Sequence, residues 1–166
     1  MAYEYNKHLP SEGQFDKNAC WAASISWWTR AMMLNYKRKI TTQSELISQF
    51  DFLCNDDGSM PLSGIRSVCE SAEIRIKLQY ITPASFKKYT SIDLPMILVF
   101  NYPLVGGTHM NVVFNQKGTT VACMEPYHSY PGKDGQRTGK YIRRDMSFFA
   151  NSQEIGVGYL PLEDSL

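Results

Sequence analysis

The hydrophobic pattern of the chain changes period near residue 73, and this change most constrains the fold. Before it, apolar residues recur every three or four positions, as on a helix with one buried face. That stripe consists of Trp21, Ile25, Trp28, Met32 and Tyr36. After it, segments such as 74–81 alternate apolar and polar residues, which is typical of strands. Helices followed by neighbouring strands predict an α+β fold with a mostly antiparallel sheet.

Turn and capping signals divide these two parts into elements. Thr41 or Thr42 with Glu45 forms a capping-box pattern that predicts a helix ending near Phe50. Further helices are expected from about Asn18, over 63–72 and, as a short piece, within 82–90. Strands are expected at 74–81, 95–102, 109–116 and 120–125, with further candidates at 140–146 and 155–160. Tight turns are expected at 55–59 and at Lys117-Gly118.

The overall composition excludes several classes of protein. With 166 residues, 43% of them hydrophobic, the chain fits one soluble globular domain over residues 1–166. A net charge of +1 argues against nucleic acid as a partner. We interpret the basic runs at 37–39 and 143–144 as a solvated helix end and a strand edge.

The sequence shows neither of two common targeting features, a membrane-spanning run and a secretory signal. No run approaches the ~18–20 apolar residues of a membrane span, so we expect no membrane partner. The N-terminus lacks the apolar stretch of a secretory signal. We therefore expect the protein to act in a cytoplasm or to leave by a route other than Sec.

The four cysteines stand at positions 20, 54, 69 and 123 and form no CxxC pair. This spacing argues against a zinc ribbon or a thioredoxin-type site, and we expect neither a metal nor a cofactor. Without a secretory signal, reduced thiols are favoured. Cys54, Cys69 and Cys123 are interpreted as buried or inert.

Cys20 differs because it stands at the expected start of a helix, where the helix dipole favours a thiolate. His109 opens an apolar strand after Gly106-Gly107-Thr108, and Glu125 ends the following strand. A lone histidine here would most simply be structural. If the two strands pair as a hairpin, however, His109 and Glu125 face each other directly with Cβ atoms about 4.5–5.5 Å apart.

These residue types together are suited to nucleophilic catalysis at a carbonyl. A cysteine thiolate attacks, an imidazolium protonates the leaving amine, and a carboxylate orients the imidazole. The oxyanion needs donors, and each typically contributes ~2.7–4 kcal/mol. The backbone N–H of Cys20 and the side-chain amide of Gln14 are the candidates.

The ordered set Q-x5-C-W-A-A-S, then G-T-H, then Glu-Pro resembles the papain-like cysteine peptidases. It is most similar to a compact bacterial branch that includes double-glycine leader peptidases and effector proteases. The resemblance implies a papain-like fold, catalytic Cys20, His109 and Glu125, an oxyanion hole with Gln14, and glycine at the cleavage site. The family has Asp or Asn at the third position, so Asp134 and Asn111 stay open as alternatives to Glu125, and His128 as an alternative to His109.

The resemblance further implies a protein substrate and, for an effector or toxin delivered into a target cell, an inhibitory or immunity protein. Three alternatives use the same scaffold: a glutamine deamidase or transglutaminase-like toxin, a non-catalytic binding module, and a peptidoglycan amidase. The polar loop 127–139 is expected to border the substrate groove.

Overall fold

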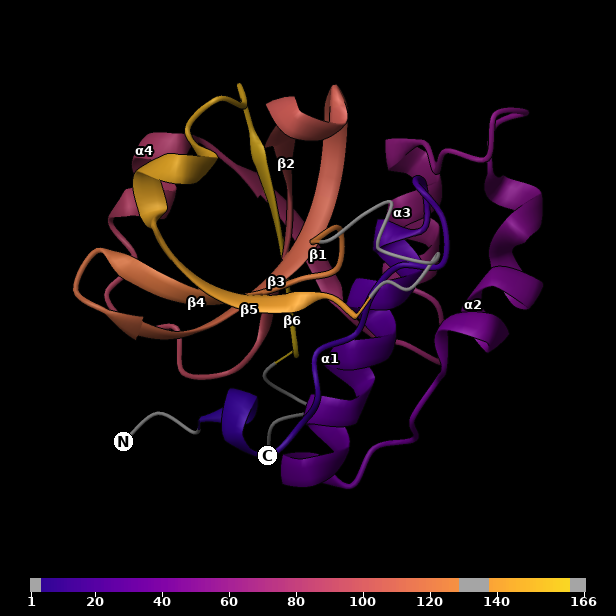
Figure 1. Cartoon of the computed structure of the whole chain (residues 1–166), viewed down its shortest axis with the longest axis horizontal. Helices are drawn as coiled ribbons and strands as arrows, with labels where there is room; N and C mark the ends of the chain where they lie inside the picture. The colour runs from indigo at the N-terminus through magenta and orange to yellow at the C-terminus, as the bar shows by residue number, and fades with distance from the viewer. Residues whose placement is uncertain (1–3, 129–137, 162–166) are drawn as a thin grey trace.

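A six-stranded antiparallel sheet, in the order β1-β6-β2-β3-β4-β5, organises the protein (Figure 1). The structure is a computed structural model and describes residues 4–128 and 138–161. The strands are β1 (Lys77–Ile81), β2 (Met96–Tyr102), β3 (Gly107–Lys117), β4 (Thr120–Glu125), β5 (Lys140–Asp145) and β6 (Ile155–Tyr159). The α-helices are α1 (Cys20–Tyr36), α2 (Gln43–Phe50), α3 (Leu62–Cys69) and α4 (Pro83–Lys87). Short 3₁₀ turns are η1 (Tyr5–Lys7), η2 (Asp51–Leu53), η3 (Pro103–Val105) and η5 (Met146–Phe149).

The predicted α+β class is confirmed, and most element boundaries agree with the sequence pattern. Thr42 caps α2 by accepting from the Glu45 backbone N–H at 3.2 Å, as the capping box predicts. The predicted strand at 74–81 was too long, because Arg75 has a φ of 59°, which interrupts the extended backbone. Ile74 and Ile76 are nevertheless buried. The alternation of apolar and polar residues at 74–76 therefore reflects the burial of alternate side chains and not a strand.

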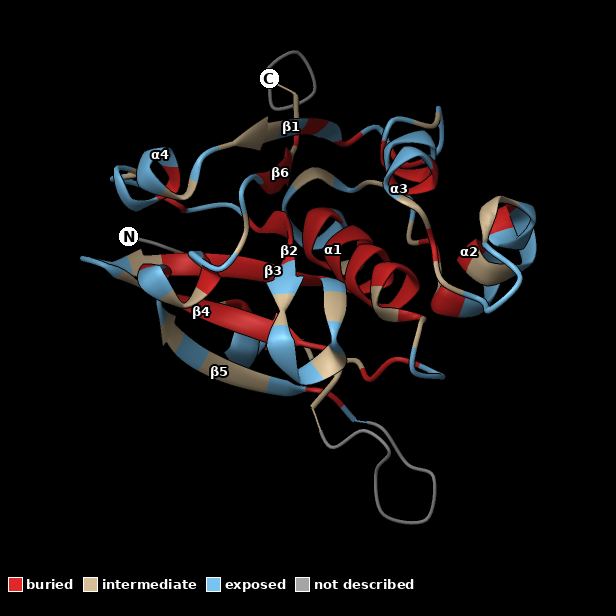
Figure 2. Ribbon diagram, turned by 90° about the horizontal axis from the view of Figure 1, so that it is seen from above, coloured by how far each residue is buried: buried red, intermediate tan, exposed pale blue. Residues whose placement is uncertain are grey.

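The helices and the sheet form two apolar layers. Helices α1, α2 and α3 lie on one side of the sheet and α4 on the other (Figure 1). Between α1 and the sheet, Trp27 stacks on Phe114 with ring centroids 5.5 Å apart. On the face of the sheet that α4 covers, Phe149 packs edge-on to Phe86 and Phe100. Figure 2 shows most of α1 buried between the sheet and helices α2 and α3; the buried residues run from Trp21 to Met32, and Met33 and Leu34 in the last turn are exposed. The single predicted stripe therefore covers only part of its buried surface.

Two basic residues that were expected to be solvated are packed instead. The Arg38 guanidinium lies 5.4 Å from the centre of the Trp28 ring and donates to the Ile74 carbonyl. Arg144 has a side chain only 10% exposed. The interpretation of the two basic runs as solvated surface was wrong for these residues, because each guanidinium lies against an aromatic ring, Trp28 for Arg38 and Phe148 for Arg144.

The β3–β4 hairpin contains a bulge that determines which side chains share a face. Lys117 pairs with Thr120 at the turn, but beyond the irregularity Phe114 pairs with Ala122. Asn115 lies inside this bulge with a φ of 50°. A regular hairpin from the same turn would set Glu125 opposite Val112, on the α1 side. The extra residue moves every later β4 side chain to the other face.

Within residues 4–128 and 138–161, no helix has the length and apolar character needed to cross a membrane. The prediction of one domain over residues 1–166 stays a prediction.

Gly158 tests how tightly β6 is enclosed. A Cβ there would lie 2.8 Å from Ile76 Cγ2 and 3.1 Å from Ile97 Cβ. We expect Gly158→Ala to lower the free energy of unfolding by about 1–3 kcal/mol through overpacking, measured by urea denaturation. Gly107→Ala is the control, because a Cβ there meets nothing within 4 Å. Equal stability of the two variants would contradict the packing described.

Candidate active site

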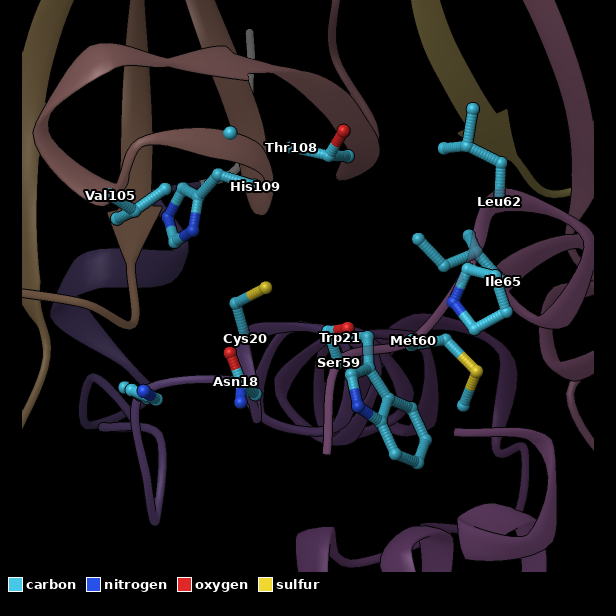
Figure 3. A pocket seen from close by; sticks show the side chains of 13 residues that line it. Asn18, Cys20, Trp21, Ser59, Met60, Leu62, Ile65, Val105, Thr108 and His109 are labelled. Carbon is cyan, nitrogen blue, oxygen red and sulfur yellow. The ribbon is translucent and has the colours of Figure 1, made fainter. Parts of the chain in front are cut away.

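A pocket of about 390 Å³ opens where the N-terminus of α1 meets the start of β3. Figure 3 shows the Cys20 sulfur and the His109 imidazole projecting into it from opposite sides. Its lining comes from the α1 start, the turn before α3 and the turn into β3: Lys17, Asn18, Cys20, Trp21, Ser59, Met60, Pro61, Leu62, Ile65, Val105, Gly107, Thr108 and His109. Two residues predicted to react thus share one cavity.

A turn around Asp16 fixes the position of Cys20. The Asp16 carboxylate accepts from the Asn18 backbone N–H at 2.8 Å, and its carbonyl accepts from Ala19. Ala19 is the N-cap and offers no side-chain acceptor, so the first turn of α1 has no side-chain cap. Its N–H groups are the kind that a helix N-terminus presents to an anion. One turn later, Ser24 donates to the Met110 carbonyl at 3.1 Å and ties α1 to the residue after His109.

The turn into β3 positions His109. Gly106 ends η3 with a φ of 75°, a conformation that glycine adopts without strain, and β3 begins at the next residue. His109 pairs with Phe100 of β2 and is 2% exposed. Its ring lies edge-on to Phe100, with centroids 5.7 Å apart, and 5.1 Å from the Tyr102 ring. The predicted role of the glycine pair in shaping this turn agrees with the structure.

His109 and Glu125 are in contact, but the predicted direct opposition was wrong. Val112 pairs with Met124, and one more step of this register sets Glu125 opposite Asn111. Glu125 therefore reaches His109 along the diagonal, where its extra methylene relative to Asp is useful. Its Oε2 hydrogen-bonds His109 Nε2. The ring nitrogen left for the thiol is Nδ1.

Electrostatics favour an imidazolium at this position. Burial alone would lower the pKa of His109, but the charges of Glu125 and Cys20 and hydrogen bonds to both raise it to about 9. Burial would likewise raise the pKa of Glu125, but His109 and Arg144 hold it below its usual value. The Cys20–His109–Glu125 arrangement can therefore hold a cation between two acidic groups.

Arg144 is the residue of this site that the sequence reasoning missed. Its Nη1 lies 2.8 Å from Glu125 Oε1, and Asn111 Nδ2 lies 3.5 Å from the same oxygen. Asn111 thus contacts the carboxylate, while Glu125 contacts the imidazole. Asp134, the other alternative, lies outside the described residues. The available signal was that a buried carboxylate on β4 needs a cation from a neighbouring strand.

Gln14 lies beside the turn that precedes Cys20. It is fully buried, and its backbone N–H donates to the carbonyl of Pro126, the residue after Glu125. Its Nε2 donates to the Asp16 carbonyl at 2.7 Å, which leaves one amide hydrogen for another acceptor. Its Oε1 accepts from no described residue. The predicted oxyanion role of Gln14 stays a prediction.

The other thiols lack the surroundings of Cys20. All four cysteines are free. Burial raises the pKa of Cys69 and of Cys123 to about 12, and burial with three nearby aspartates raises that of Cys54. These are surroundings of poor nucleophiles, which agrees with their predicted inertness. His128 is not among the residues that line the pocket. In the described part of the chain, no group of three or more His, Cys, Asp or Glu side chains is placed to hold a metal ion.

No protein-family model and no curated protein matches the chain. Among solved structures, it is similar to the peptidase domain of Streptococcus ComA, a bifunctional ABC transporter involved in a quorum-sensing pathway. The TM-score is 0.63 at 14% sequence identity, and the match covers 93% of this chain and all of that domain. The chain has a papain-like α+β fold. At this identity, the likeness establishes the fold alone.

The raised pKa of His109 predicts a pH-dependent stability. The imidazole has an ordinary pKa of 6.5 when unfolded and about 9 when folded. Its contribution is therefore fully present below pH 6.5 and is lost as pH rises through 9. Urea unfolding of wild type and His109→Gln should differ by up to roughly 3 kcal/mol near pH 6, with the difference narrowing by pH 9.5. A difference independent of pH would show that His109 is not held as a cation.

Proposed function

We propose that this protein is a cysteine endopeptidase that cleaves a protein substrate. The observation that carries the proposal is that Cys20, at the start of a helix, and His109 line one pocket, while Glu125 hydrogen-bonds the His109 ring. The papain-like fold is consistent with it, because that fold hosts peptidase domains such as the one described above.

Acylation uses the thiolate and the imidazolium together. The Cys20 sulfur bonds to the substrate carbonyl carbon, and the electron pair moves onto the carbonyl oxygen. The Cys20 backbone N–H and the free amide hydrogen of Gln14 donate to that oxygen. His109 then gives its Nδ1 proton to the leaving amine as the C–N bond breaks. The products are a thioester on Cys20 and a free amine.

Deacylation reverses the roles of the groups. The neutral imidazole removes a proton from water, the oxygen of which attacks the thioester carbon. The C–S bond breaks and returns the thiolate and imidazolium. Glu125 accepts the Nε2–H throughout, which fixes the tautomer with Nδ1 toward the thiol. The net reaction is hydrolysis of one amide bond.

Two finer aspects rest on the resemblance of the sequence motifs. We propose a preference for glycine beside the scissile bond, which mapped cleavage sites would read directly. The role as a bacterial effector or toxin, restrained by an immunity protein, stays a prediction.

Replacement of the nucleophile is the first test. Cys20→Ala should abolish cleavage, by about 10⁴-fold or more, because the covalent step has no other nucleophile. Labelling of new N-termini in a lysate treated with wild type or variant measures it. Cys54→Ala, another partly exposed thiol, should remain active. Full activity of Cys20→Ala would refute the proposal.

The same samples distinguish the alternative chemistry. A deamidase would give intact proteins about 1 Da heavier in a Cys20-dependent way, with no new N-termini. A binding module would give neither change.

Gln14→Ala tests the oxyanion hole. Loss of one preorganised donor should lower kcat by about 10²–10³-fold with little change in KM, because the charge appears only in the transition state. Steady-state cleavage of a peptide containing the mapped site provides both constants. Circular dichroism melting controls for the cavity at this buried position. A change confined to KM would assign Gln14 to substrate binding.

A further inference from the structure

The second oxygen of the Glu125 carboxylate is bound by Arg144. Oε2 contacts His109 Nε2 and also accepts from the Tyr127 backbone N–H at 3.2 Å. Oε1 accepts from Arg144 Nη1 at 2.8 Å and from Asn111 at 3.5 Å. The side chain of Glu125 is 1% exposed. Both oxygens therefore have protein donors, and the carboxylate is almost shielded from water.

Aromatic rings hold the Arg144 guanidinium in place. Its central carbon lies 4.2 Å from the centre of the Phe148 ring and 5.5 Å from that of Tyr102. Its Nη2 donates to the Tyr102 hydroxyl at 3.4 Å. The same Tyr102 ring packs against His109. Arg144 and the imidazole therefore share one aromatic wall.

Strand pairing explains why this arginine reaches this carboxylate. Arg144 of β5 pairs with Val121 of β4, two alternations before Glu125 on the same face. Its long side chain runs along that face past Cys123, with which it also interacts. The neighbouring Arg143 points away and contacts the Asn115 carbonyl and Thr120. Only one of the two arginines serves the site.

We propose that Arg144 is a positioning residue of the active site, which fixes the Glu125 carboxylate so that it orients His109 toward Cys20. This inference rests on the proposed function. A glutamate has one more rotatable bond than an aspartate, so its carboxylate needs a second restraint. Arg144 provides it, because Nη1 donates to Glu125 while Nη2 and the guanidinium face are held by Tyr102 and Phe148.

Arg144 also keeps Glu125 charged during the reaction. In the resting site, Glu125 faces two cations, His109 and Arg144. After His109 has protonated the leaving amine, only Arg144 remains charged. Without it, a buried carboxylate beside a neutral imidazole would favour protonation, and the Nε2–H would lose its acceptor. The arginine makes the leaving amine, rather than Glu125, the destination of the proton.

The titratable groups that face Glu125 and its partners are Cys20 on α1, Tyr102 on β2, His109 on β3, Cys123 on β4, Tyr127 after β4 and Arg144 on β5. Two of them, Tyr102 and Cys123, can be set aside because they stay neutral at acidic pH. Burial raises the pKa of Tyr102, and that of Cys123 to about 12. An acid limb in the reactivity of Cys20 therefore reports the Cys20, His109 and Glu125 group.

The test is the rate of Cys20 alkylation by iodoacetamide between pH 4 and 10, followed by peptide mass spectrometry. In Arg144→Gln, Glu125 should take up a proton more readily and support the imidazolium less. The acid limb should move up by about one pH unit relative to wild type. Arg144→Lys retains the positive charge, so its acid limb should lie close to that of wild type. A profile of folded Arg144→Gln that overlays wild type would overturn the proposal.

Two further variants make the result specific. Arg30→Gln removes another arginine that pairs with a glutamate, Glu12 at 3.6 Å, and should leave the profile unchanged. Glu125→Gln needs no cation, so adding Arg144→Gln to it should change nothing more. This pair decides the matter even if Arg144→Gln alone does not fold. A further shift in the double variant would show that Arg144 acts by another route.

Alkylation does not depend on a substrate, so it separates this inference from the proposed function. Cys20 in wild type should react faster than Cys54. If it does not, the proposed function fails. If Cys20 reacts fast but the profile ignores Arg144, only the role of Arg144 is overturned.

Discussion

The carboxylate of Glu125 is negatively charged and almost completely shielded from water, and the strands around it must supply its partners. A buried carboxylate is costly unless charged or hydrogen-bonding partners replace its hydration. Here the partners come from β3, β5 and the second residue after β4: His109, Asn111, Arg144 and the Tyr127 backbone N–H. A slip of any of these strands would leave a buried charge without partners. The charge therefore costs stability but specifies the register.

Two hydrogen bonds tie the α1 region to residues next to this charged cluster. Gln14 joins the segment before α1 to Pro126, and Ser24 joins α1 to Met110. These bonds flank Cys20 on one side and His109 and Glu125 on the other. One backbone bond and one side-chain bond to a backbone carbonyl thus help to fix the position of the thiol relative to the imidazole, as a preorganised site requires.

Local signals in the sequence were sufficient for most elements and for the two residues, Cys20 and His109, that the structure brings to one pocket. The capping box at Thr42 and the apolar run of β2 depend on neighbouring residues, so both were predicted closely. Cys20 and His109 became candidates because a helix start and a glycine-rich turn are visible in the sequence. The side of the sheet on which Glu125 lies could not be predicted, because it depends on a β-bulge at Asn115. Arg144 was missed because its partner is nineteen positions away on another strand. Such contacts follow from packing rather than from local pattern.

The choice of a glutamate as the third residue has a consequence for the whole site. A neutral amide at this position would orient an imidazole without any compensating charge. A glutamate stabilises the protonated form of His109, but its own carboxylate must be held in place and kept ionised. The guanidinium of Arg144 meets both needs, and its position depends in turn on Tyr102 and Phe148. The aromatic cluster behind the sheet is therefore connected to the thiol through three successive charged groups. Substitutions there are expected to act on reactivity as well as on packing.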